Sequence, residues 1–419
     1  MRASHPVFLC GFRPFFLLVA AGGILLMPAW LLMLLGAMPG WQPPGGIIAW
    51  HAHELIYGLG MAAVAGFLLT AVPEFTRSPP IGPGALRGLT LLWLGARLAY
   101  AASAGWPDSL GLWPAAACDL AFSTSLLAQL APALWRDPQR RHLGFAYALA
   151  TLILLQAGFH VSIALGGDAM AWLRAAVGVF MILIVMAGSR VSMNVVNGHI
   201  EAGRPSEPPQ GEVGYLARPP RRKLAVFCIA AASAVEFLSG PGPVTAWVAL
   251  AAAAALFNLL NDWHVGRALF RRWTLMLYGG YWLIGLGYGA MGLAWLGLPI
   301  TASAGRHLLM AGAMSLTILA IMCIAGRIHA GLWLDRRPWA PIAAIALVLA
   351  AALRAAAGTG AAGAGVVPLL GLSGLAWSAA FALYLWHAGP ILAGPRGDGQ
   401  AGCAEPLQDA TPGPRCDVP

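Results

Sequence analysis

The sequence predicts an all-α fold: a polytopic membrane protein of about twelve transmembrane helices, with both termini in the cytoplasm. Hydrophobic residues make up 59% of the 419 residues and charged residues only 10%, whereas a soluble domain carries roughly 25% charged residues. So few charges suit a protein whose sides face hydrocarbon. The formal net charge is +9, but the basic residues lie in short segments between apolar runs. Membrane topology therefore explains them, and nucleic-acid binding is not expected.

The predicted spans are continuous apolar stretches. A helix needs roughly 20 such residues to cross about 30 Å of hydrocarbon. The stretches are rich in Leu, Ala and Gly, and none alternates as a β-barrel strand does. In chain order, the twelve spans are 15–37, 54–72, 85–104, 112–134, 143–165, 169–190, 221–240, 243–262, 273–296, 303–325, 339–357 and 366–388.

The basic residues gather in alternate loops. Under the twelve-span count, 21 of the 25 Lys and Arg residues fall on the side that holds both termini. Only Arg174, Arg306 and Arg354 fall on the other side, and Arg97 lies inside the third span. Because Lys and Arg are enriched in cytoplasmic loops, this distribution predicts that both termini are cytoplasmic.

Two segments outside the spans complete the predicted organisation. Residues 1–393 form the helical bundle, in which the Pro-rich cytoplasmic loop 191–220 separates two six-span halves. The tail 394–419 is rich in Gly, Pro, Asp and Gln, and we expect it to be disordered in the cytoplasm. Its cysteines, Cys403 and Cys416, have no histidine neighbours and are interpreted as free thiols.

Four histidines share one layer near the outer ends of the predicted helices. His51 and His53 precede the second span, His160 lies in the fifth, and His307 opens the tenth. Neutral imidazole commonly ligates haem iron, copper and zinc, and two facing helices can each supply one haem ligand. His51 and His53 would point about 200° apart on one helix and so could not both face one metal. If His51 lies in the loop instead, its ring is free to turn inward. Glu54 is suited to orient a ligating histidine. The alternative is that each histidine is only hydrogen-bonded.

Arg97 and Asp119 lie inside the third and fourth spans at matching depths. Burying either charge alone in a membrane is costly, so the sequence predicts an ion pair between them. The pair would either tie two helices together or leave Arg97 to face a haem propionate or another anionic ligand.

Four stretches of the sequence resemble the NnrS family of bacterial membrane proteins. The longest runs from WHAHE (50–54) to GFLLTAVP (66–73), and the others are GFRPFF (11–16), LWLGARL (92–98) and RHLLMAGA (306–313). The chain is identified as a divergent member, because residues 74–77 and 324–331 depart from the family's pattern. The resemblance implies membrane-bound haem b and copper, and a role in tolerance of nitric oxide and nitrosative stress. It points to His51, His53 and His307 as ligands, with Arg13 and Arg97 as further motif positions. Arg327, which lies in one of the two divergent stretches, is a further candidate supporting residue.

We therefore expect a multi-pass protein of the bacterial inner membrane, surrounded by lipid. A haem would lie between the second and tenth helices, bound by His53 and His307. The sequence assigns neither an enzymatic activity nor a redox partner. One alternative is a secondary transporter for a small anion or a metal, with Arg97 as its charge. Another is a structural or sensory subunit without a ligand of its own.

Overall fold

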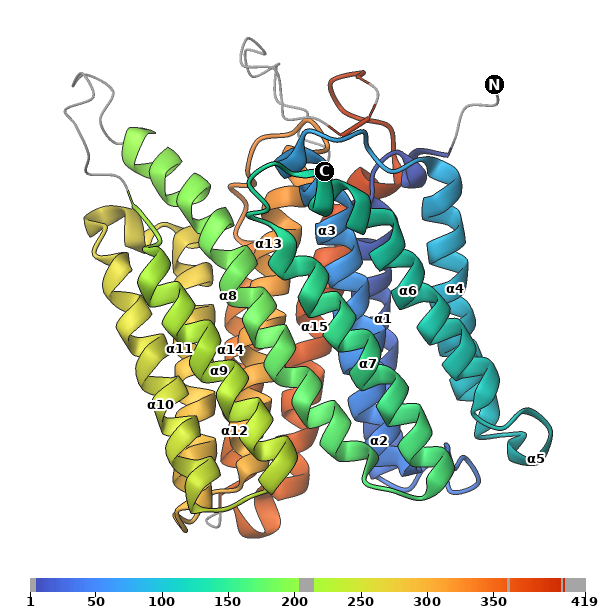
Figure 1. Cartoon of the computed structure of the whole chain (residues 1–419). Helices are drawn as coiled ribbons and strands as arrows, with labels where there is room; N and C mark the ends of the chain where they lie inside the picture. Colours follow the sequence, from blue (N-terminus) through green and yellow to red (C-terminus); the bar gives the residue numbers. More distant parts are fainter. Residues whose placement is uncertain (1–4, 203–214, 360–361, 401, 404–419) are drawn as a thin grey trace.

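A computed structural model describes residues 5–202, 215–359, 362–400 and 402–403, which form one bundle of helices (Figure 1). Within these ranges the chain has no strand, only an isolated bridge between Ile300 and Thr359. The long helices are α1 (Phe12–Leu34), α3 (Met61–Thr76), α4 (Pro83–Ser103), α6 (Trp113–Arg136), α7 (Leu143–Leu165), α8 (Ala169–Ala202), α9 (Pro219–Ser239), α10 (Pro243–Leu259), α11 (Arg272–Trp295), α13 (Ser315–Ile328), α14 (Trp339–Ala356) and α15 (Val366–Ala393). The shorter elements are η1 (Pro6–Phe8), α2 (Gly46–His53), η2 (Glu54–Gly60), α5 (Pro107–Leu110), η3 (Leu260–Trp263), η4 (Gly266–Phe270), α12 (Ala302–His307), η5 (Leu308–Met314) and η6 (Gly363–Gly365).

Nine helices of the described ranges are long and apolar enough to cross a membrane. The prediction of an all-helical, multi-pass membrane protein is thus confirmed. The other three predicted spans coincide with α4, α9 and α11, which are comparable in length. However, α4 contains two arginines, α9 begins with three basic residues and α11 is rich in glycine, and all three features lower the mean hydropathy. The count of twelve spans and the cytoplasmic termini remain predictions.

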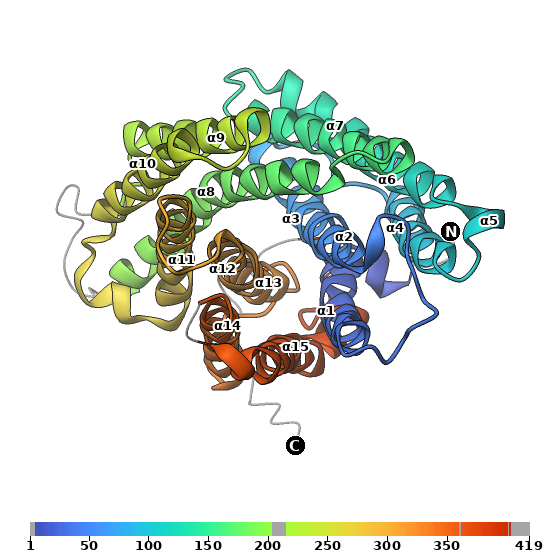
Figure 2. The same cartoon turned by 90° about the horizontal axis from the view of Figure 1, so that it is seen from below.

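Successive long helices pack side by side around the bundle. Contacts run in series from α6 through α11, and α15 closes the arrangement against α1 and α14. Figure 2 shows α12 and α13 on the inner side of α8 and α11, facing α14 and α15. The two most buried of the nine apolar helices are the segments 46–76 and 302–328. These two segments carry His51, His53 and His307.

Both of these central segments change from α-helix to π-helix directly after a histidine. His53 ends α2 before the π-helix η2, and His307 ends α12 before the π-helix η5. A π-turn widens the helix by one residue and is frequent at functional sites. The α2 and α12 segments lie at the same end of the bundle (Figure 1), which we call the α2/α12 end.

The loop between the two predicted halves is shorter than expected. Helix α8 continues to Ala202, so it extends twelve residues beyond the predicted end of the sixth span at 190. Helix α9 begins at Pro219, close to the predicted position. The intervening residues 203–214 lie outside the described ranges.

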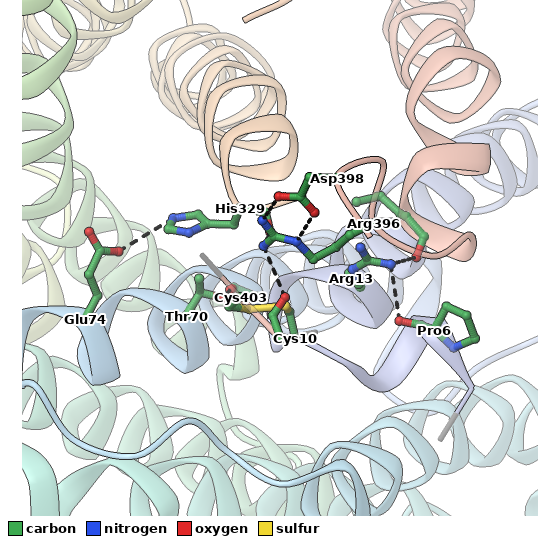
Figure 3. Close-up of a disulfide and its surroundings, with 12 residues drawn as sticks. Pro6, Cys10, Arg13, Thr70, Glu74, His329, Arg396, Asp398 and Cys403 are labelled. Carbon is green, nitrogen blue, oxygen red and sulfur yellow. Dashed lines mark hydrogen bonds and ion pairs between the residues drawn. A yellow bond between two sulfur atoms is a disulfide. The ribbon is translucent and has the colours of Figure 1, made fainter. Parts of the chain in front are cut away.

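The first part of the C-terminal tail packs against the start of α1 (Figure 3), at the opposite end of the bundle from α2 (Figure 1). Arg396 is buried, and its guanidinium donates hydrogen bonds to the backbone oxygen of His329 and to Asp398. Cys403 forms a disulfide with Cys10, so the interpretation of Cys403 as a free thiol was wrong. The remaining tail residues, including Cys416, lie outside the described ranges.

Candidate functional site

His51 and His53 of α2 face different parts of the bundle. The His51 ring stacks on Trp30 of α1, with a centroid distance of 4.1 Å. The His53 ring is fully buried and stacks on Phe159 of α7 at 4.7 Å. Both residues lie in α2, so their side chains point in different directions, as expected for positions two apart on a helix. The alternative in which His51 lies in a loop is therefore wrong. One short helix therefore supplies histidines to two separate places.

His53 belongs to a buried group of five side chains that we call the polar cluster. Its members come from four helical segments and are His53, Glu54, Arg97, Asp119 and His160. Nδ1 of His53 lies 3.2 Å from Oε1 of Glu54. Oδ2 of Asp119 lies 3.3 Å from Nε2 of His53 and 3.4 Å from Nε2 of His160. The sequence placed these histidines in one layer, and the structure brings two of them to one carboxylate.

Arg97 holds the two carboxylates of the polar cluster in place. Its guanidinium donates to Asp119 Oδ1, and its Nη1 lies 2.9 Å from Glu54 Oε1. The predicted ion pair between Arg97 and Asp119 is thus confirmed. Gly58 allows the close approach of Arg97, because a Cβ atom at this position would lie 2.6 Å from Nη1. With Arg97 engaged on one side, Asp119 presents its other oxygen to the histidines.

Four ring or carboxylate atoms of the polar cluster have no hydrogen-bond partner among the described residues. They are His53 Nε2, Asp119 Oδ2 and both ring nitrogens of His160. A buried polar atom without a partner costs free energy, so such atoms are rare and call for an explanation. One ligand atom from each of His53, Asp119 and His160 lies within 4.8 Å of the other two, close enough for all three to contact one metal ion.

His51 lines a cavity of about 470 Å³, together with His307. Side chains from α1, α2, α8, α12, η5, α14 and α15 surround this space, which we call the His51/His307 cavity. Most of the lining is apolar, including Trp30, Met310 and Trp377. The volume falls within the range of about 300–1,000 Å³ found for small-molecule and cofactor sites.

His307 is fixed in orientation by its own helix. Nδ1 of His307 lies 2.8 Å from the backbone oxygen of Ser303, to which it donates in the matching tautomer. That tautomer leaves Nε2 with a free lone pair, the state in which a histidine ligates a metal. His51 and His307 are near enough to interact electrostatically.

The cavity is also lined by three arginines, Arg174, Arg306 and Arg354. Arg306 pairs with Glu236 of α9, and Arg174 pairs with the exposed Asp168 at 2.7 Å. Arg354 donates to Ser303 Oγ at 3.1 Å and makes no ion pair with a carboxylate in the described ranges. Since no described carboxylate lines the cavity itself, this space favours an anionic group.

The structure does not pair His53 with His307 as the sequence-based hypothesis did. His53 lies in the polar cluster, whereas His307 shares its cavity with His51. The physical reason is the angle of about 200° between positions two apart on a helix, which lets only one of His51 and His53 face α12. His160 likewise joins His53 rather than the cavity.

Two of the predicted supporting residues, Arg13 and Arg327, lie at the opposite end of the bundle. Arg13 is buried and donates through Nη1 to backbone oxygens, including that of Leu392 at 3.2 Å. Arg327 lies 3.4 Å from Asp335. Both residues fix the ends of helices, and neither contacts the polar cluster or the cavity.

His329 also lies at this opposite end, just beyond α13. Its Nε2 lies 3.6 Å from Oε2 of Glu74 (Figure 3). Burial and the nearby Arg396 guanidinium lower the pKa of His329 to about 4, so the ring is neutral at pH 7. It is remote from the other candidate histidines.

Sequence reasoning missed the role of the three cavity arginines. A signal was present, because Arg174, Arg306 and Arg354 are the only basic residues placed on the outer side by the twelve-span count. Their convergence on one cavity depends on how α8, α12 and α14 pack, which no local pattern reveals.

A comparison with models of protein families shows which family the chain belongs to. The model of the family described as NnrS protein matches residues 6–396, nearly the whole length. The chain belongs to the NnrS family. No curated protein matches it. The residues of the polar cluster and of the His51/His307 cavity all lie within the matched range.

Proposed function

We propose that this NnrS protein binds haem b in the bacterial inner membrane and contributes to tolerance of nitric oxide and nitrosative stress. The observation that carries the proposal is the His51/His307 cavity, in which two imidazoles and three arginines meet inside an apolar wall. Haem supplies an iron centre that binds nitric oxide or exchanges electrons.

The residues present fit a haem in three respects. Each of His51 and His307 could offer a ring nitrogen to the haem iron, and the contact with Ser303 would keep Nε2 of His307 free in the matching tautomer. Trp30, Met310 and Trp377 are suited to pack against a flat apolar macrocycle. Arg354, which has no carboxylate partner in the described ranges, is suited to a propionate, with Arg174 and Arg306 beside it.

Copper is the second metal that the family resemblance implies. The His51/His307 cavity offers copper two histidines and methionine sulfur, but its volume of about 470 Å³ and its three arginines suit a larger, anionic group. We therefore propose haem for the cavity. The transporter alternative is not favoured, because the chain's family membership supports an NnrS-like role instead.

The test is an absorption spectrum of the full-length protein, purified in detergent after expression with ample haem. The expected result is a Soret band that is lost in His307→Ala, in a variant that elutes as a monodisperse species. A strain lacking the gene should regain growth under a nitric oxide donor from the wild-type gene but not from His307→Ala. Wild-type protein without a Soret band would contradict the haem proposal, and full rescue by His307→Ala would contradict its link to nitric oxide.

A further inference from the structure

We propose that His53, Asp119 and His160 form a second, separate site that binds one divalent first-row transition-metal ion, such as Cu²⁺ or Zn²⁺. This site lies in the polar cluster and shares no lining residue with the His51/His307 cavity. The inference goes beyond the proposed haem and does not depend on it.

The two distances from Asp119 Oδ2 to the histidine nitrogens fit a metal site better than they fit hydrogen bonds. Asp119 Oδ2 lies 3.3 Å from His53 Nε2 and 3.4 Å from His160 Nε2. Hydrogen bonds between N–H and oxygen peak at about 2.9–3.0 Å, and these atoms do not meet hydrogen-bond geometry. Ligands about 2.0–2.2 Å from a tetrahedral Zn²⁺ ion are separated by about 3.3–3.5 Å, the edge of the tetrahedron. The observed separations match that edge.

The surrounding groups hold each ligand in the state that a metal requires. In the tautomer in which Nδ1 of His53 donates to Glu54 at 3.2 Å, Nε2 of that ring carries the lone pair, and it lies 3.3 Å from Asp119 Oδ2. A carboxylate behind a histidine ligand is the usual arrangement in metal sites, where it fixes the tautomer and raises the basicity of the ring. Arg97 orients Asp119 in a similar way, because it donates a hydrogen bond to Oδ1 and leaves Oδ2 free to bind the metal.

The donor atoms of the site limit which metal ions it can bind. Two imidazoles and one carboxylate suit Fe²⁺, Cu²⁺ and Zn²⁺, of which Cu²⁺ and Zn²⁺ bind the more tightly, whereas Mg²⁺ and Ca²⁺ prefer an all-oxygen set. Each of the three ligand residues is buried, and the aromatic ring of Phe159 covers His53. Three protein ligands leave a fourth position for a small exogenous ligand. The site would therefore hold a metal ion through three buried protein ligands, with one coordination position left for a small molecule.

The charge of the cluster supports the same conclusion. Glu54 and Asp119 carry two negative charges, and Arg97 carries one positive charge. Two carboxylates against one arginine make the surroundings of the two rings negative, which favours a cation there. A cation bound there would also contact the ring and carboxylate atoms that have no hydrogen-bond partner among the described residues.

The test is metal analysis of the purified full-length protein, stripped with a chelator and then loaded with Cu²⁺ alone or with Zn²⁺ alone. We expect close to one ion per wild-type chain, and at least a tenfold loss of affinity in His160→Gln (about 1.4 kcal/mol). The matched control is His307→Ala, which should lose haem yet keep the metal. In contrast, His160→Gln should keep haem. The haem proposal and the metal-site proposal can therefore be tested independently of each other.

A second measurement covers the case in which His160→Gln does not fold. X-ray absorption of Zn²⁺ bound to the wild-type protein should show first-shell nitrogen and oxygen with the multiple scattering of two imidazoles. A spectrum without imidazole scattering would overturn the site. So would a metal content in folded His160→Gln equal to that of wild type, or a wild-type protein that retains neither metal.

Discussion

The polar cluster and the His51/His307 cavity begin two residues apart on α2, but they are built on opposite principles. In the polar cluster, two carboxylates and an arginine surround histidines with little space to spare. In the cavity, two histidines and three arginines line about 470 Å³ of largely apolar space. The first arrangement fits a small cation and the second fits a large, flat, anionic cofactor. Histidines at similar positions along α2 thus have different neighbours, and we expect these neighbours to decide which ligand each histidine can bind.

The largest effect on haem content is expected from His307→Ala, which removes one proposed histidine ligand. Haem content should fall about a hundredfold or more, beyond the 10–100-fold losses of metal affinity that follow changes to the groups behind metal ligands. The measurement is the Soret absorbance per chain, and His160→Gln is the control that should retain haem. Equal haem loss in the two variants would remove the distinction between the sites.

Replacing Asp119 by Asn tests whether the polar cluster also stabilises the fold. The change leaves Arg97 buried with one carboxylate instead of two, and breaking a buried pair costs about 3–5 kcal/mol. The free energy of unfolding in detergent should fall by this amount. Asp168→Asn is the matched control, because its pair with Arg174 is exposed and should be worth about 1 kcal/mol or less. Similar losses in both variants would argue against a tightly buried cluster.

Arg354→Ala tests whether the cavity selects an anionic cofactor. Hydrogen bonds to charged groups contribute about 1.5–3 kcal/mol, so haem affinity should weaken by about ten- to a hundredfold. Haem transfer to an acceptor protein measures this change. Arg337→Ala, at an exposed arginine of the opposite end, should leave haem affinity unaltered. An unchanged affinity in Arg354→Ala would remove that arginine from the haem site.

The smallest effect is expected from Gly58→Ala, which should disturb the polar cluster and spare the cavity. The new methyl group would lie 2.6 Å from Arg97 Nη1, and such overpacking costs about 1–3 kcal/mol. Gly88→Ala in α4 is the control, since nothing lies within 4 Å of its new methyl group. Thermal unfolding with and without Zn²⁺ should show a lower Tm and weaker metal stabilisation only for Gly58→Ala. Equal behaviour of the two variants would contradict the crowded geometry around Arg97.

Much of the fold could be predicted from the sequence, because a helix that crosses a membrane needs a long run of apolar residues. The long apolar runs predicted helices at positions that the structure bears out, and matching depth in the membrane predicted the pair between Arg97 and Asp119. The disulfide between Cys10 and Cys403 had no such signal, since the two residues are 393 positions apart.

The histidines of the candidate sites could be predicted from the sequence, but which of them share a site could not. Topology placed His51, His53, His160 and His307 in one layer, because depth depends only on position along each span. The partner of each ring depends on the rotation of one helix about its axis relative to the next, which the sequence does not encode locally. The π-turns after His53 and His307 alter that rotation further.

The central claim is that neighbouring histidines on α2 serve different ligands, and the most direct measurement is the haem content of His51→Gln and His53→Gln. Both variants would be purified in detergent under identical conditions, and haem would be counted per folded chain. The account predicts that His51→Gln loses haem while His53→Gln retains it. Loss of haem in His53→Gln with full retention in His51→Gln would contradict it.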